Sequence, residues 1–149
     1  WKILSLIFGM LAISIAMEKV GLINLVVNQT MAAIPNAGPL LMLGFVYLLT
    51  SLLTEILSNN AVAVLLTPIA IGVAQQMGVD PRPFVVAVMF AASASFATPI
   101  GYQTNTFVYN AGGYKFSDFL RIGIPLNVLM LIVAMLVIPW IWPLTPVAG

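Results

Sequence analysis

Residues 39–77 read PLLMLGFVYLLTSLLTEILSNNAVAVLLTPIAIGVAQQM, in which the polar triplet Ser58-Asn59-Asn60 separates two apolar runs. Pro39 suits the first turn of a helix, because the backbone hydrogen that proline lacks has no partner there. Gly78 follows the second run and suits a helix end, because glycine tolerates the left-handed conformation. The stretch therefore predicts a helical hairpin with a polar tip.

The composition places this hairpin in a membrane. Of the 149 residues, 62% are hydrophobic and 6% are charged, whereas an ordinary soluble domain has about 25% charged residues. Such a chain cannot cover a water-facing surface, which excludes a soluble enzyme and a disordered chain. The sequence has no cysteine or histidine, which excludes disulfides, thiolate metal sites and histidine-based catalysis. The net charge of +1 gives no basic patch, so we expect no nucleic acid as a partner.

The predicted fold class is an all-α integral membrane protein, with residues 1–149 in a single membrane domain. Segment 21–33 is too short and too polar for a span and reads as an amphipathic helix in the membrane interface. Segment 122–142 ends in Trp140 and Trp142, and such aromatic residues favour the lipid–water boundary. The predicted elements are a transmembrane helix over 3–20, the interfacial helix over 21–33, the hairpin over 39–77, a broken transmembrane helix over 81–112 and a transmembrane helix over 122–142.

A second polar stretch interrupts the segment 81–112. Pro99 removes a backbone donor and clashes with the preceding turn, and Gly101 lowers helix stability by about 1 kcal/mol relative to alanine. We therefore expect helix to about Ala97, non-helical chain around 98–105 and a short helix from about Thr106. Irregular backbone at membrane depth survives only where protein or a water-filled cavity covers it. The hairpin tip and this break are therefore expected to pack against each other.

The two polar stretches carry neutral oxygen and amide groups rather than charges. Backbone carbonyls, hydroxyls and Asn amides are hard oxygen ligands that suit Na⁺. The start of the second hairpin arm, near Asn60 and Ala61, offers free N–H groups and the positive end of a helix dipole to an anion. The alternative is that residues 58–60 form an ordinary surface loop between two complete spans. The second break favours the reading in which the tip lies inside the membrane, because that break needs a partner cavity.

Glu55 is the one acid inside an apolar stretch. An ionisable residue within a membrane is by default a functional candidate, here as a proton carrier. The alternative is a structural role, in which its carboxylate binds free N–H groups or hydroxyls near the hairpin.

Two stretches carry a resemblance to a known family. These are TEILSNNAVAVLLTPIAI (54–71) and FATPIGYQTNTFVYNAGGY (96–114). They resemble the hairpin and the unwound stretch of the divalent anion/sodium symporter family, part of the wider group of citrate-transporter-like ion transporters. The resemblance covers nearly the whole chain and corresponds to the C-terminal repeat of such a protein.

The resemblance implies one half of an inverted-repeat transporter that works as a homodimer by an elevator-like motion. Each repeat of that fold has a re-entrant helical hairpin and a broken helix. Ser58 and Asn59 match the first two residues of the family's Ser-Asn-Thr tip, whereas Asn60 departs from it. Asn105 matches the Asn of the unwound stretch.

Three further residues of the break stand where the family has its ion-coordinating and Pro-Pro positions, namely Gly101, Gln103 and Thr104. Gln103-Thr104 in place of Pro-Pro points to a divergent subfamily, closer to transporters of sulfate or other inorganic anions.

The predicted function is secondary active transport, with Na⁺-coupled symport of a small di- or trivalent anion such as a dicarboxylate, citrate or sulfate. The predicted substrate-binding residues are Ser58, Asn59, Asn60, Thr104 and Asn105, and the predicted Na⁺ ligands are Ser58, Asn59, Gly101, Gln103 and Asn105. The alternatives are an H⁺-coupled transporter that uses Glu55 and a non-transporting membrane subunit. An enzyme is not expected. The expected partners are the lipid bilayer, the anionic substrate and the other transporter repeat, in a multi-pass protein of the inner (plasma) membrane.

Overall fold

A computed structural model describes residues 1–33 and 37–146, and it is mainly helical. Its elements are α1 (Lys2–Lys19), α2 (Leu22–Ala33), α3 (Pro39–Thr54), α4 (Asn59–Gln76), α5 (Arg82–Ser93), α6 (Gln103–Gly112) and α7 (Phe116–Ile141). Within the described ranges no strand forms, and an isolated bridge pairs Val79 with Pro146. The prediction of an all-α chain is confirmed.

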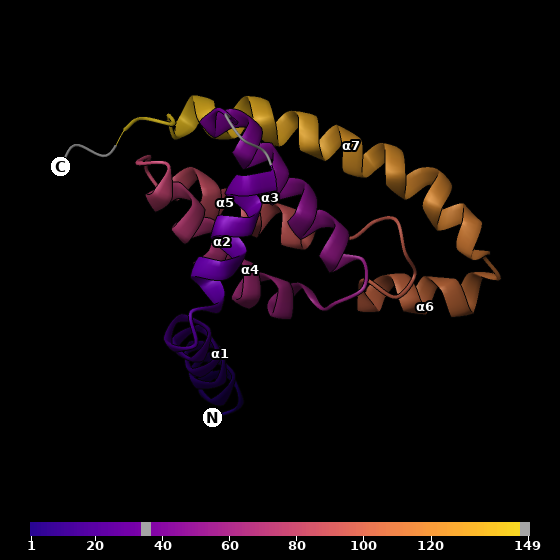
Figure 1. The fold of residues 1–149 in the computed structure, drawn as a ribbon. Coiled ribbons are helices and arrows are strands. Elements are labelled where there is room, and N and C mark those ends of the chain that lie inside the picture. Colours follow the sequence, from indigo (N-terminus) through magenta and orange to yellow (C-terminus); the bar gives the residue numbers. More distant parts are fainter. Residues whose placement is uncertain (34–36, 147–149) are drawn as a thin grey trace.

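The core lies where α5 packs against both arms of the hairpin formed by α3 and α4 (Figure 1). Tyr47 of α3, Val62 of α4 and Phe84 of α5 are almost completely buried there. Pro39 stands at the start of α3, and Ser58 caps α4 by accepting a hydrogen bond from the N–H of Ala61 at 3.4 Å. The two arms thus begin at Pro39 and Asn59, and their arrangement as a re-entrant hairpin in the membrane remains a prediction.

Helix α2 follows α1 after a bend of 71° and packs against α4. Gly72 of α4 allows this approach, because a Cβ there would lie 3.0 Å from a methyl carbon of Val27. The amide of Gln76 also donates to Asn28 Oδ1 at 3.0 Å. Helix α2 covers the predicted segment 21–33, and its placement in the membrane interface remains a prediction.

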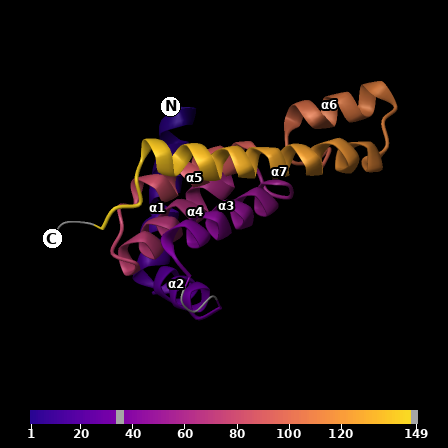
Figure 2. The ribbon, with the colours of Figure 1, turned by 90° about the horizontal axis from the view of Figure 1, so that it is seen from above.

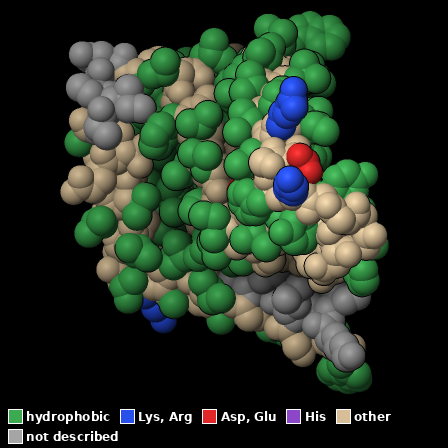
Figure 3. All heavy atoms as spheres, turned by 90° about the vertical axis from the view of Figure 1, so that its right-hand side faces the viewer, with side chains coloured by type: hydrophobic (Ala, Val, Ile, Leu, Met, Phe, Trp, Pro, Cys, Tyr) green, Lys and Arg blue, Asp and Glu red, His purple; other side chains and the backbone are tan. Residues whose placement is uncertain are grey.

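Helix α7 extends along one side of the hairpin and reaches beyond it to α6 (Figures 1 and 2). Among the described residues, α7 is the single helix that is long and apolar enough to cross a membrane by itself. The bent pair Leu11–Lys19 and Leu22–Ala32 would be a second span if the two helices are counted together as one span. The face of the molecule near the α6–α7 connection is mostly hydrophobic (Figure 3). Basic and acidic side chains lie together in one region of this face, and a further basic side chain lies apart from them at the lower left.

The broken helix differs from the prediction at its boundaries. Helix α5 ends at Ser93, earlier than the expected Ala97, and α6 begins at Gln103, earlier than the expected Thr106. The N–H groups that would continue α5 are bound by Glu55 instead of by helix carbonyls. Helix α7 begins at Phe116 rather than at 122, because the Asp118 carboxylate accepts from the Lys115 N–H at 2.8 Å and caps the helix there.

Candidate functional site

The hairpin tip and the break in the second helix share one cavity, which we call the tip cavity. Its volume is about 540 Å³. Its lining residues are Ser58, Asn59, Asn60, Ser93, Ile100, Gly101, Tyr102, Gln103 and Thr106. None of these residues is charged, so within the described chain the cavity offers hydroxyls, amides and backbone groups.

Two helices begin at this cavity, and one ends there. Asn59 is the first residue of α4 and Gln103 is the first residue of α6, while Ser93 is the last residue of α5. First-turn N–H groups lack helical acceptors and carry partial positive charge, whereas last-turn carbonyls carry partial negative charge. The tip cavity therefore presents donors suited to an anion beside oxygens suited to a cation.

The side chain of Asn59 has acceptor capacity beyond its contacts in the chain. Thr54 Oγ1 lies 3.0 Å from Asn59 Oδ1 and 2.7 Å from the carbonyl oxygen of Ala92. A hydroxyl has a single hydrogen to donate, so it serves these two oxygens one at a time. The Asn59 oxygen is therefore available to a cation or a water molecule in the tip cavity.

Gly101 lies close to the end of α3 with no room for a side chain. A Cβ there would stand 1.9 Å from Ser95 Oγ and 3.2 Å from the carbonyl oxygen of Thr54. Ser95 Oγ itself donates to that same carbonyl at 3.1 Å. The break is thus held against the end of the first hairpin arm, beside the tip cavity that Gly101 lines.

Asn105 and Thr104, both predicted as ligands, lie outside the tip cavity. Asn105 Nδ2 donates to the carbonyl oxygens of Ser95 at 3.0 Å and of Thr98 at 3.1 Å. Its side chain therefore turns back into the break and holds two of the loop carbonyls. Thr104 is exposed. Ser58 is exposed within the described chain, and the depth of the tip in the membrane remains a prediction.

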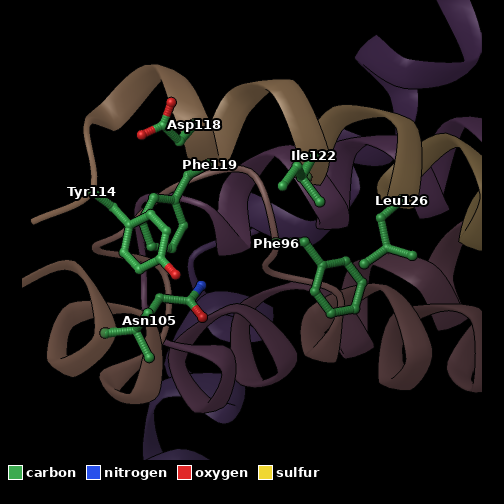
Figure 4. A pocket seen from close by; sticks show the side chains of 9 residues that line it. Phe96, Asn105, Tyr114, Asp118, Phe119, Ile122 and Leu126 are labelled. Carbon is green, nitrogen blue, oxygen red and sulfur yellow. The ribbon is translucent and has the colours of Figure 1, made fainter. Parts of the chain in front are cut away.

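Asn105 borders a second pocket of about 320 Å³ between α6 and α7. Tyr114 and Phe119 form an edge-to-face pair in its wall, with ring centroids 6.3 Å apart. Figure 4 shows both rings next to Asn105, while the Asp118 carboxylate points away from them. This pocket is mainly aromatic and aliphatic, so it lacks the polar groups of the tip cavity.

Glu55 is 7% exposed and does not line the tip cavity. Its carboxylate accepts hydrogen bonds from the backbone of the break, which agrees with the structural alternative given by the sequence. Four hydroxyl-bearing residues in or beside the tip cavity were not predicted as ligands, namely Thr54, Ser93, Tyr102 and Thr106. Their signal was weak, because single hydroxyls are common on helices that pack in membranes.

Comparison with known proteins identifies the family of this chain. A family model described as a citrate transporter matches residues 1–147. The chain belongs to this citrate transporter family. Membership makes the chain part of a membrane protein of a transporter family rather than of an enzyme family.

The relatives of this chain are much longer than the chain itself. An uncharacterized transporter of Synechocystis sp. is 44% identical over 98% of the chain, which is 24% of that relative. The uncharacterized transporter YfbS of Escherichia coli is 39% identical over 96% of the chain and 23% of its own length. Sodium/sulfate cotransporter 1 of Chlamydomonas reinhardtii is 35% identical over 90% of the chain and 15% of its own length. The chain thus spans about a quarter of the length of the first two relatives. The predicted resemblance to the anion/sodium symporter family is confirmed.

Proposed function

We propose that this chain supplies half of the binding region of a secondary transporter that couples Na⁺ to the uptake of a small di- or trivalent anion. Sulfate, citrate and dicarboxylates are the candidate substrates. The observation that carries the proposal is the tip cavity, where two interrupted helices meet around neutral oxygen and amide groups.

The cation would bind at the oxygens of the tip and the break. Ser58, Asn59, Gly101 and Gln103 offer side-chain or backbone oxygens of the hard type that Na⁺ prefers. A neutral ligand set suits a symporter, because a carboxylate at this place would repel the anion that must bind alongside.

The anion would bind at the starts of α4 and α6. Asn59, Asn60 and Gln103 present amide groups there, and their backbone N–H groups belong to the first turns of these helices. Two helix dipoles then supply the positive potential that a lysine or arginine supplies in a soluble anion site. A bound Na⁺ would add a full positive charge beside the anion, which makes the binding of the two mutually favourable.

The geometry does not favour H⁺ coupling through Glu55. The carboxylate already serves four N–H donors of the chain itself. It would have to break these contacts to take up and release a proton in each transport cycle. It also stands outside the tip cavity, away from the proposed substrate.

Residues 39–77 would then form a re-entrant hairpin with its tip inside the membrane, and residues 81–112 a broken transmembrane helix. A second repeat of inverted topology would complete the site, in a homodimer of the inner membrane. The support is the resemblance of the two polar stretches to the symporter family and the match to the citrate transporter family.

Reconstitution of the full-length protein into liposomes tests the proposed function. Uptake of radiolabelled sulfate, succinate and citrate is measured under an inward Na⁺ gradient, an inward H⁺ gradient or neither. The proposal expects the Na⁺ gradient alone to accelerate uptake of at least one of the three anions. Uptake that follows the H⁺ gradient and ignores Na⁺, or no uptake of any of them, would contradict it.

A further inference from the structure

The proposed transport site leaves one buried acid without a task, although that acid lies at the centre of a hydrogen-bond cluster. Glu55 Oε1 accepts from the backbone N–H groups of Phe96 at 3.0 Å and Ala97 at 2.9 Å. Oε2 accepts from the N–H of Thr98 at 2.8 Å, and the Thr98 hydroxyl donates to the Glu55 carbonyl at 2.7 Å. Three successive N–H groups of the break thus surround one carboxylate of the hairpin.

Successive N–H groups that point to one place form an anion-binding concavity. Here the anion is a side chain of the same protein, supplied from 41 to 43 residues earlier in the sequence. Hydrogen bonds to an ionised acceptor are roughly twice as strong as neutral ones. The carboxylate therefore holds residues 96–98 in a non-helical conformation that their own sequence does not fix.

Helix α7 contacts the same place at two successive turns. Asn127 Nδ2 donates to Glu55 Oε1 at 2.7 Å. One turn earlier, a Cβ on Gly123 would lie 2.2 Å from the carbonyl oxygen of Phe96. Residues four apart share one face of a helix, so α7 presents this face to the break and has no room there for a larger residue than glycine.

We infer that Glu55 and Asn127 are positioning residues that set the affinity of the proposed transporter for Na⁺. This inference rests on the proposed function. Neither residue lines the tip cavity, so neither contacts the bound ion. They act through residues 96–98, which continue directly into Pro99–Tyr102 and so into the wall opposite Asn59 and Asn60.

The Glu55 side chain also links three elements that are far apart in sequence. Glu55 follows α3 directly, and its carboxylate accepts hydrogen bonds from the break and from α7. These bonds hold the end of α3, residues 96–98 of the break and this part of α7 together at Glu55.

The variant Glu55→Gln tests the inference in the full-length protein. Glutamine keeps the shape of the side chain but loses the charge, and its NH₂ group can only donate where the carboxylate accepted. The half-saturating Na⁺ concentration for uptake should rise at least about fivefold, the lower end of usual coupling between sites. The rise in thermal midpoint that Na⁺ produces in the purified protein should shrink in parallel, since that rise depends on Na⁺ affinity.

Asn127→Ala removes one of the four donors and keeps the charge, so it should raise the half-saturating Na⁺ concentration in the same direction by a smaller factor. It also serves as the test if Glu55→Gln does not fold. Glu18→Gln is the matched control, because Glu18 is exposed near the end of α1. It should change neither the half-saturating Na⁺ concentration nor the rise in thermal midpoint that Na⁺ produces.

The outcomes separate this inference from the proposed function. A wild-type protein without any Na⁺ effect on uptake contradicts the proposed function. A wild-type protein with that effect, together with folded Glu55→Gln or Asn127→Ala variants that keep wild-type Na⁺ dependence, overturns the positioning role alone.

Discussion

The hydroxyl of Thr54 lies 2.7 Å from the carbonyl oxygen of Ala92, so the last turn of α3 is bonded to the last turn of α5. Both groups are buried, and Thr54 is completely so. The contact brings together the two places where the chain leaves a helix inside the core. The hairpin tip and the break are therefore adjacent because the helix ends before them are joined directly.

Replacing Thr54 by Val should destabilise the protein. Valine keeps the shape but leaves the buried Ala92 carbonyl without this donor, which costs about 1–3 kcal/mol. Thr54→Ser is the control, since it retains the hydroxyl. The measurement is denaturant unfolding of the purified protein in detergent. Equal stability of the Val and Ser variants would show that the contact contributes nothing.

Gly101→Ala should impair the site, and the impairment should depend on Ser95. The added Cβ would lie 1.9 Å from Ser95 Oγ, so the break must move or the serine must turn away. Ser95→Ala removes that oxygen together with its bond to the Thr54 carbonyl. Na⁺-dependent uptake should be lower in Gly101→Ala than in wild type, and the double variant should be less impaired than the two single effects predict together. Simple additivity would contradict this account of the close approach.

Asn105→Asp should weaken the break although the residue keeps its size. The aspartate has no N–H groups to donate to the carbonyl oxygens of Ser95 and Thr98, and its oxygens repel them. Loss of the two bonds should cost about 1–3 kcal/mol each, measured as a lower thermal midpoint. Asn110→Asp on the same helix is the control, since Asn110 is exposed. A thermal midpoint that falls equally in both variants would leave no special role for Asn105.

A cysteine at position 58 should report occupancy of the tip cavity. Ser58 lines that cavity and is exposed within the chain. In a background without other accessible cysteines, Na⁺ should slow the reaction of Ser58→Cys with a membrane-impermeant thiol reagent. Gln75→Cys, at the other end of α4, should react at the same rate with and without Na⁺. Equal rates at position 58 in both conditions would argue against an ion at the tip.

The hairpin could be predicted from the sequence because its signals are local. Pro39 and Ser58 act within the first turns of α3 and α4, and such effects depend on neighbouring residues alone. Gly78, expected at a helix end, has a left-handed φ of +68° after α4 and is a signal of the same kind. Fold class and the order of elements follow from signals of this sort.

The end of α5 could not be predicted, because its cause is distant in sequence. The expected helix end at Ala97 rests on Pro99, which acts within one turn. The structure ends the helix at Ser93, since Glu55 binds the N–H groups of Phe96 and Ala97. A side chain more than 40 residues away decides this boundary.

Only part of the candidate site could be predicted, because the start of α6 was not predicted correctly. Five predicted residues share the tip cavity, namely Ser58, Asn59, Asn60, Gly101 and Gln103. The other two, Thr104 and Asn105, were chosen as part of a non-helical stretch. Helix α6 begins at Gln103, so Thr106 shares the face of Gln103 while Thr104 and Asn105 point elsewhere.

The Na⁺ dependence of uptake by Asn59→Ala tests the central claim most directly, because Asn59 supplies a side-chain oxygen at the meeting point of the tip and the break. The half-saturating Na⁺ concentration should rise in this variant by a larger factor than the amount of protein in the membrane falls. Asn110→Ala, with an exposed side chain outside the tip cavity, should match wild type in both readings. An Asn59→Ala protein with the wild-type half-saturating Na⁺ concentration would contradict a shared ion site at the tip cavity.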